Sequence, residues 1–226
     1  MIFEHFYRKF EKLRNKQKHE WPDSKKKLDK HTATFEQLKE FRYLVRNKAD
    51  ETSIHTFLDS NNVIFYFALK DYSTGHHGLW VYSQQEIQPR IKSTKTKGMI
   101  PDFIIGGENS DGHQWFVVEL KGANENIFRS YSDESLGLSS VANKGICQLI
   151  EYTDVCSKNQ SHFRDSFRMR DFGVPKGILL IGTEDELKDS RKQNLKRSLN
   201  QNFNKNFEIR TYDWLLRNFE YEMKHR

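Results

Sequence analysis

Ile100-Pro101-Asp102-Phe103-Ile104-Ile105 and Trp115-Phe116-Val117-Val118-Glu119-Leu120-Lys121 are the two segments that decide how this chain folds. Both are apolar runs of strand length, and the Gly-, Asn- and Asp-rich residues 106–112 between them are typical of a turn, so we expect a β-hairpin. Side chains alternate across a strand, so Glu119 and Lys121 lie on the same face. Charged groups inside apolar strands are costly unless they bind a metal or each other. The hairpin therefore marks the candidate functional site.

Asp102 and Glu119 predict a divalent metal site. Mg²⁺ takes oxygen ligands and keeps several of its waters, so two carboxylates and a substrate phosphate are enough to hold it. The backbone carbonyl of Leu120 is a candidate third ligand, and Mn²⁺ is expected to substitute for Mg²⁺. Lys121 would orient a metal-activated water, and desolvation would lower its pKa towards the range of a general base. The alternative is a buried salt bridge between Lys121 and one of the acids.

Three further residues are candidates for the same site. Gln148 and Tyr152 are four positions apart in a predicted helix over residues 145–157, so they share a helix face. Gln148 would support the metal site by hydrogen bonding, and the Tyr152 hydroxyl would contact phosphate. Glu51, at the start of another predicted helix, is a further candidate metal ligand, or else a surface residue that the helix dipole stabilises.

The order of these residues resembles that of the PD-(D/E)xK nuclease superfamily, including the Q-x-x-x-Y element of its RecB-like branch. The resemblance covers residues 100–182. It rests on two acids, a lysine, two residues on one helix face and a buried strand: Asp102, Glu119, Lys121, Gln148, Tyr152 and residues 178–181. It implies an α/β fold with a restriction-endonuclease-like mixed β-sheet core flanked by helices. It also implies that the five side chains catalyse Mg²⁺-dependent hydrolysis of a phosphodiester bond.

Two further segments are similar to the Shedu family. They are Glu51-Thr52-Ser53-Ile54-His55-Thr56-Phe57-Leu58-Asp59-Ser60-Asn61 before the core and Arg210-Thr211-Tyr212-Asp213-Trp214-Leu215 near the C-terminus. This resemblance spans residues 50–216 and implies an anti-phage nuclease of the prokaryotic cytosol that cuts or nicks DNA as a homo-oligomer, either a dimer or a tetramer. Gly122-Ala123 follows Lys121 where the family often has a basic residue and then a proline, so the chain departs from the family pattern there.

Two other functions fit the same residues. A restriction-type or junction-resolving nuclease would have the same core and would reveal itself by a fixed cleavage sequence or by a preference for branched DNA. A catalytically silent nuclease fold would serve as a DNA-binding or assembly module. Such a module, however, has no need to keep three charges on its strands.

The composition argues against several classes of protein. The chain has 226 residues, no apolar run near the roughly 20 residues that cross a membrane, and no signal-peptide pattern at its start, so we expect a cytoplasmic protein. Cys147 and Cys156 do not form a Cys-x-x-Cys pair and predict neither a disulfide nor a zinc site. Gly106-Gly107 lacks the Gly-Lys-Ser/Thr ending of a phosphate loop, and no small-molecule cofactor is indicated.

Positive charge is concentrated at the front of the chain. Residues 1–50 hold 14 Lys and Arg against 8 Asp and Glu, whereas the remaining residues balance. We therefore divide the chain into a basic helical N-terminal arm, 1–50, and a nuclease domain, 51–226. The arm would contact a phosphate backbone or would simply be solvated. A second basic stripe, on a helix predicted over residues 184–203, faces either DNA or solvent and consists of Lys188, Arg191, Lys192, Lys196 and Arg197.

The remaining pattern predicts alternating helices and strands. Thr34 and Gln37 are expected to form a capping box before a helix whose buried face holds Phe35, Leu38, Phe41, Leu44 and Val45. Other expected helices cover residues 2–18, 51–59 and 213–224, and other expected strands cover 63–69, 79–87, 177–182 and 207–212. Residues 122–144, rich in Ser, Asn and charge, are expected to form a long loop.

Overall fold

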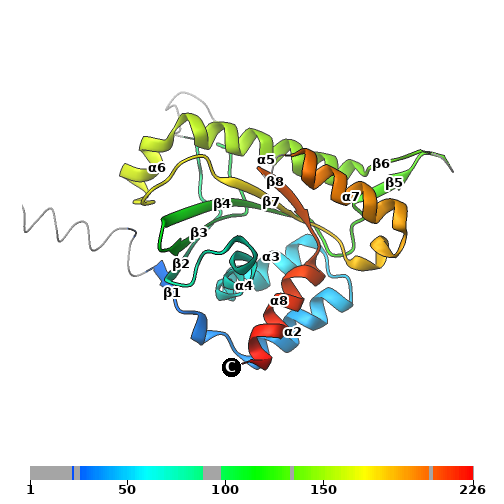
Figure 1. Ribbon diagram of the computed structural model, residues 1–226, viewed down its shortest axis with the longest axis horizontal. Helices are drawn as coiled ribbons and strands as arrows, with labels where there is room; N and C mark the ends of the chain where they lie inside the picture. Colours follow the sequence, from blue (N-terminus) through cyan, green and yellow to red (C-terminus); the bar gives the residue numbers. More distant parts are fainter. Residues whose placement is uncertain (1–21, 23–25, 89–97, 133–134, 204–205, 226) are drawn as a thin grey trace, which may run out of the picture.

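The structure, a computed structural model, describes residues 22, 26–88, 98–132, 135–203 and 206–225. In this part of the chain six strands form one mixed sheet (Figure 1). Their spatial order is β1 (Lys27–Leu28), β2 (Gly78–Ser83), β3 (Phe103–Asn109), β4 (Gly112–Leu120), β7 (Lys176–Leu180) and β8 (Phe207–Arg210). The pairings are antiparallel from β1 to β4 and parallel from β4 to β8. The predicted α/β class is confirmed, whereas the helix predicted over residues 2–18 lies outside the described residues.

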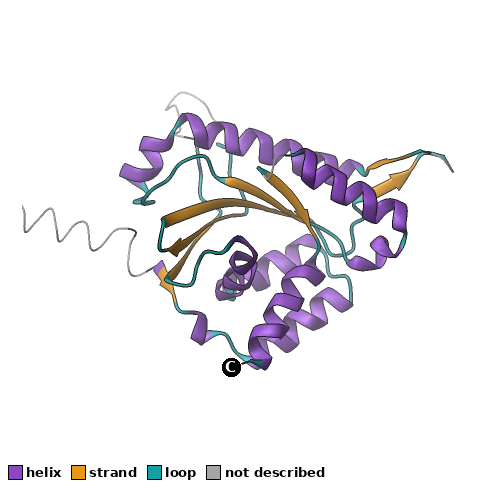
Figure 2. Ribbon diagram, in the orientation of Figure 1, coloured by secondary structure: helices purple, strands orange, loops and turns teal. Residues whose placement is uncertain are grey.

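Helices cover both faces of the sheet (Figure 2). One layer contains α5 (Ser140–Lys158), α6 (Gln160–Ser166) and α7 (Ser190–Asn202), and the other contains α2 (Phe35–Arg46), α3 (Glu51–Ser60), α4 (Phe65–Leu69) and α8 (Tyr212–Lys224). Alternation along β4 divides the core in two: Trp115 and Val117 pack in the cluster on the α5 side, and Phe116 and Val118 pack in the other. Each layer thus buries its own apolar face, as expected for an α/β sandwich.

The β3–β4 hairpin forms as predicted, but its strands extend further into the expected turn. Phe103 pairs with Val118 at one end and Asn109 with Gly112 at the other, so only two residues connect the strands. Strand position 106 is a glycine because the ring of Trp115 lies over it. An added Cβ there would approach Trp115 Cζ3 to 2.4 Å. Gly106 therefore makes room for an aromatic ring.

The helix predicted after Thr34 is confirmed as α2, with both hydrogen bonds of the capping box. Leu38, Phe41 and Val45 are buried, whereas Phe35, the first helical residue, is 65% exposed and was wrongly expected in the buried face. α2 packs against α8 and its buried residues belong to the same apolar cluster as those of α3. The domain boundary placed at residue 50 stays a prediction.

The strand predicted over residues 63–69 is wrong. The structure has a short 3-10 turn, η3 (Asn62–Ile64), followed by α4, and every residue of α4 is buried. A helix that is buried on all sides shows no amphipathic period, so a short apolar run of this kind reads as a buried strand.

The long loop predicted over residues 122–144 is also wrong in part. It contains a hairpin of β5 (Phe128–Ser130) and β6 (Leu136–Leu138), and α5 begins at Ser140. Ser139 caps this helix by accepting a hydrogen bond from the backbone N–H of Ala142, so one of the serines that suggested a loop in fact starts a helix. The helix predicted over 184–203 is split into η5 (Glu184–Lys188) and α7.

Candidate active site

The carboxyl end of β4 carries the acid–lysine pair. Lys121 Nζ donates a hydrogen bond of 2.8 Å to Glu119 Oε1, and the two side chains are only 7% and 5% exposed. Their face of the strand is the one covered by α5, because Val117, two residues earlier, packs in that cluster. Two charged groups therefore lie under a helix in a largely dry environment.

Asp102 joins the start of β3 to the end of β4. The backbone N–H of Leu120 donates to Asp102 Oδ2 at 2.7 Å. Because Phe103 pairs with Val118 in the sheet, Asp102 lies next to Glu119. His55 Nε2 of α3 lies 3.9 Å from Asp102 Oδ1, and the His55 ring stacks on Phe103. His55 was not foreseen from the sequence, because no spacing links a helix residue to an aspartate 47 positions away.

The two carboxylates disfavour each other's charge. Burial and, to a smaller extent, the nearby Asp102 carboxylate raise the pKa of Glu119 to about 7 against the opposing effect of Lys121. Burial also raises the pKa of Asp102, with the Leu120 N–H acting in the opposite direction. Buried carboxylates whose charges repel are stabilised by a proton or by a cation placed between them.

Lys121 does not have the lowered pKa that the sequence suggested. Burial acts to lower the pKa of its ammonium, but the hydrogen bond to Glu119 and the charges of the surrounding acids outweigh burial and raise it. One of those acids is Glu51, whose Oε2 lies 3.6 Å from Lys121 Nζ. The side chain is therefore a charged hydrogen-bond donor, and the expectation of a neutral general base is wrong.

α5 brings Gln148 and Tyr152 to the same region. Tyr152 donates to the backbone carbonyl of Ile100 at 3.3 Å and lies 3.4 Å from Gln148 Nε2. Burial raises the pKa of Tyr152 to about 12, and the negative charge of Glu119 acts in the same direction. The Gln148 Oε1 atom is buried without a hydrogen-bond partner among the described residues. An unpaired buried acceptor of this kind points to an unfilled partner, such as an ion or a water.

This donor set fits a metal with few protein ligands. Among the described residues, no three His, Cys, Asp or Glu side chains come together as a metal cluster. Mg²⁺ differs from zinc or calcium in needing only one or two carboxylates, because waters and substrate oxygens complete its shell. Asp102 and Glu119 meet that requirement, while the roles proposed for the Leu120 carbonyl and for Glu51 stay predictions.

The backbone of Lys121 is held from the neighbouring strands. Its N–H donates to the Leu180 carbonyl at 2.8 Å, and its carbonyl accepts a hydrogen bond of 2.7 Å from the hydroxyl of Tyr212. Tyr212 is fully buried at the start of α8, 91 positions along the chain. The sequence reasoning missed this contact, for which no local pattern exists.

The predicted basic stripe does not form one surface. Lys188 pairs with Asp185 at 2.9 Å in solvent, and Lys192 pairs at 3.2 Å with Glu186, whose carboxylate also accepts the backbone N–H groups of Ile127 and Phe128. Lys196 instead lines a pocket between α7 and β8. The contacts with nucleic acid expected of Lys188, Arg191, Lys192 and Lys196 stay predictions.

Residues 48–216 match the family described as Shedu protein SduA, C-terminal, and this match covers more than half of the chain. A comparison with curated proteins finds no match. No helix in the described part of the chain combines the length and the apolar character needed to cross a membrane.

Proposed function

The chain belongs to the Shedu family, and on this premise we propose that it is a Mg²⁺-dependent DNA endonuclease or nickase that acts in anti-phage defence. One observation carries the proposal. Glu119 is buried at the end of β4, and the partly buried Asp102 lies beside it just before β3. The pKa of both carboxyl groups is raised, and a charged lysine donates directly to Glu119. Such an arrangement favours a cation, and the surrounding groups are those that a phosphodiester requires.

Each side chain has a role that its surroundings support. Asp102 and Glu119 would hold Mg²⁺, or Mn²⁺ in its place, and the bound metal would supply an activated water and stabilise charge on phosphate oxygens. Lys121, charged and fixed by its backbone contacts, donates to Glu119 and would stabilise negative charge on the substrate. Tyr152 keeps its proton at neutral pH and so would donate to a phosphate oxygen, with Gln148 beside it.

A second candidate function rests on the same hydrogen bond. The 2.8 Å contact between Lys121 and Glu119 is a complete internal ion pair, which a silent nuclease fold would keep as a structural element. In that case the chain would bind DNA or assemble without cleaving. Asp102, however, lies outside this pair, and the raised pKa of both acids shows that their negative charges are incompletely balanced, which favours the enzyme.

The test is cleavage of supercoiled and linear plasmid by the purified chain and by Lys121→Ala, with Mg²⁺, Mn²⁺ or EDTA. We expect nicking or linearisation by the wild type that EDTA abolishes and that Lys121→Ala lacks, while the variant stays folded and binds DNA. The matched control is Lys158→Ala, because Lys158 is 70% exposed at the far end of α5. A fixed cleavage sequence would indicate a restriction-type enzyme, and cleavage by Lys121→Ala at the wild-type rate would refute the site.

A further inference from the structure

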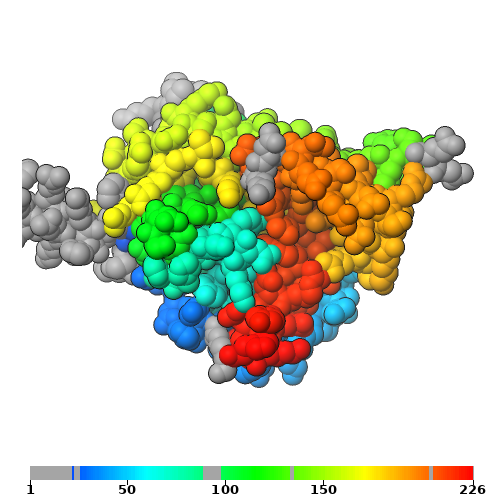
Figure 3. Space-filling model, in the orientation of Figure 1, coloured from blue at the N-terminus to red at the C-terminus, as the bar shows by residue number. Residues whose placement is uncertain are grey.

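A pocket of about 740 Å³ lies between α7, β8 and α8, apart from the site described above. None of the proposed catalytic residues lines it. Figure 3 shows the red atoms of this region beside the orange atoms of α7. The size is that of a site for a small organic ligand.

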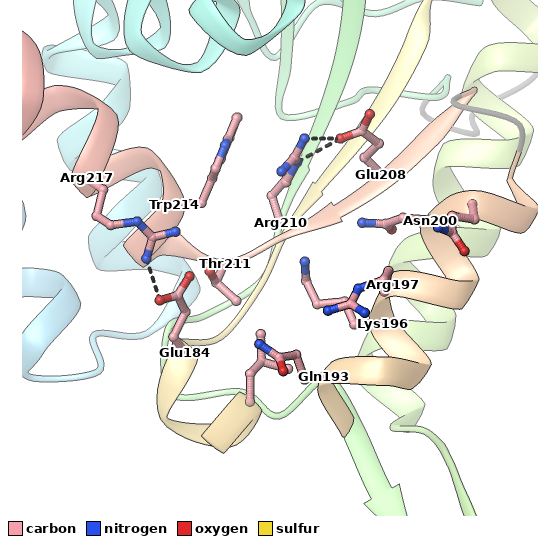
Figure 4. A pocket seen from close by; sticks show the side chains of 12 residues that line it. Glu184, Gln193, Lys196, Arg197, Asn200, Glu208, Arg210, Thr211, Trp214 and Arg217 are labelled. Carbon is pink, nitrogen blue, oxygen red and sulfur yellow. Dashed lines mark hydrogen bonds and ion pairs between the residues drawn. The ribbon is translucent and has the colours of Figure 1, made fainter. Parts of the chain in front are cut away.

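Cationic side chains outnumber acidic ones in this pocket (Figure 4). Two of the cations are neutralised: Arg210 Nε donates to Glu208 at 2.7 Å, and Arg217 pairs with Glu184. The other two, Lys196 and Arg197, have no hydrogen-bond or ion-pair partner among the residues that the structure describes. The lining therefore carries an excess of about two positive charges at neutral pH.

Lys196 is the most informative of these groups. Its amino group points into the space between α7 and β8 in Figure 4, with no interaction drawn to it. Burial and, to a smaller extent, the Arg210 guanidinium lower its pKa to about 8, against the opposing charges of Glu184 and Glu208. An ammonium that is desolvated beside a guanidinium is stabilised by a bound anion.

The geometry favours phosphate among the possible anions. Arg210 lies over the Trp214 ring, 4.8 Å from its centroid, so the arginine is held in place and the ring is covered. Guanidinium groups bind phosphate oxygens through paired N–H donors, and two unpaired cations match the charge of a phosphomonoester dianion. Gln193 and Thr211 add neutral donors to the same lining. The pocket is larger than one phosphate group needs, which leaves space for a sugar or a base.

We propose that this pocket binds the phosphate group of a nucleotide, either free in solution or within a DNA strand. The proposal goes beyond the nuclease function and does not depend on it, because the pocket contains none of the residues assigned to catalysis. Both sources present the same chemistry to Lys196, Arg197 and the two paired arginines. If the ligand is a free nucleotide, a mononucleotide is sufficient for binding; if it is a DNA strand, a longer chain is needed.

Binding measurements on the purified full chain test this. Calorimetric titration would use adenosine 5′-monophosphate, adenosine without the phosphate, and a single-stranded oligothymidylate, each with wild type, Lys196→Gln and Arg217→Gln. Thermal melting of each variant would verify that it is folded. Lys39→Gln is the matched control, because Lys39 is exposed on α2 and loses the same charge.

We expect the monophosphate to bind, adenosine not to bind, and each pocket variant to weaken monophosphate binding about tenfold while the control stays within about twofold. Binding of the oligothymidylate alone, weakened in both pocket variants, would support the pocket with a strand as its ligand. Affinities for both phosphate-bearing ligands that are unchanged in Lys196→Gln and Arg217→Gln would overturn the proposal. Adenosine binding as tightly as its monophosphate would also overturn it.

Discussion

The ends of β4 and β8 are two regions of the same sheet edge with opposite charge. Both strands run parallel to β7, so their carboxyl ends point the same way, the edge at which α/β sheets commonly bind ligands. At β4 the buried acids outnumber the lysine, whereas at β8 the cations outnumber the acids. Charge is incompletely paired in both regions, and on the proposals above the acidic region would take a cation and the basic region an anion.

Two adjacent residues connect the two regions. Thr211 lines the basic pocket, and the adjacent Tyr212 donates its hydroxyl proton to the Lys121 carbonyl at the acidic site. The connection is short along the chain and fully buried, so the position of β8 and the position of Lys121 are set together. The acidic and basic regions are therefore two connected parts of one sheet edge.

The largest effect on ligand binding is expected for the metal at the acidic region. Asp102→Asn removes one of two carboxylates, so affinity for Mn²⁺, measured by calorimetric titration, should fall by about 100-fold or more. Asp111→Asn is the matched control, because Asp111 is exposed in the β3–β4 turn. Equal Mn²⁺ affinity in the wild type and Asp102→Asn would contradict a cation site at the acidic region, and with it the proposed difference between the two regions.

A smaller effect is expected where the two regions meet. Tyr212→Phe leaves the buried Lys121 carbonyl without its donor, which should lower the free energy of unfolding by about 1–3 kcal/mol in a denaturant titration. Tyr43→Phe, at a position 67% exposed, should change it by less than about 0.5 kcal/mol. Equal free energies of unfolding for Tyr212→Phe and Tyr43→Phe would contradict a stabilising role for the Tyr212 hydrogen bond.

The smallest effect is expected from pH at the basic region. Because the folded pKa of Lys196 is lowered to about 8, its ammonium loses its proton as pH rises through that value, and monophosphate affinity should then fall. The facing groups are Arg210, Arg217, Glu184 and Glu208, and arginine and glutamate side chains ordinarily keep their charge from about pH 7 to about pH 9.

The same titrations at about pH 7 and about pH 9 would measure this, with an expected change of about threefold to tenfold. Lys196→Gln removes the titrating group, so its affinity should not depend on pH in this range. A pH dependence of equal size in that variant would assign the effect to another residue.

Much of the fold was predictable because strong local patterns produced it. The capping box at Thr34, the β3–β4 hairpin and the apolar strand β7 all form where their residues indicated. α4 was mistaken for a strand because all five of its residues are buried, so the run shows neither helical nor strand alternation. Local periodicity fails wherever the surroundings bury every side of an element.

The candidate site was predictable only where spacing along the chain links its residues. Asp102, Glu119, Lys121, Gln148 and Tyr152 were singled out by spacing, and the structure places them around the end of β4. His55 lies near Asp102, 47 positions away, and Tyr212 contacts Lys121, 91 positions away. Such contacts depend on how whole helices and strands pack together. The raised pKa of Lys121 likewise follows from three acids meeting it in space.

The most direct measurement is the initial rate at which wild type and Glu119→Gln nick supercoiled plasmid in Mg²⁺. The substitution keeps the shape of the side chain and removes the charge that the metal needs. We predict metal-dependent nicking by the wild type and a rate lower by about 10³-fold in Glu119→Gln, with Glu36→Gln, exposed on α2, at the wild-type rate. Equal rates in wild type and Glu119→Gln would contradict the account, as would a wild type that binds DNA without nicking it in Mg²⁺ or Mn²⁺.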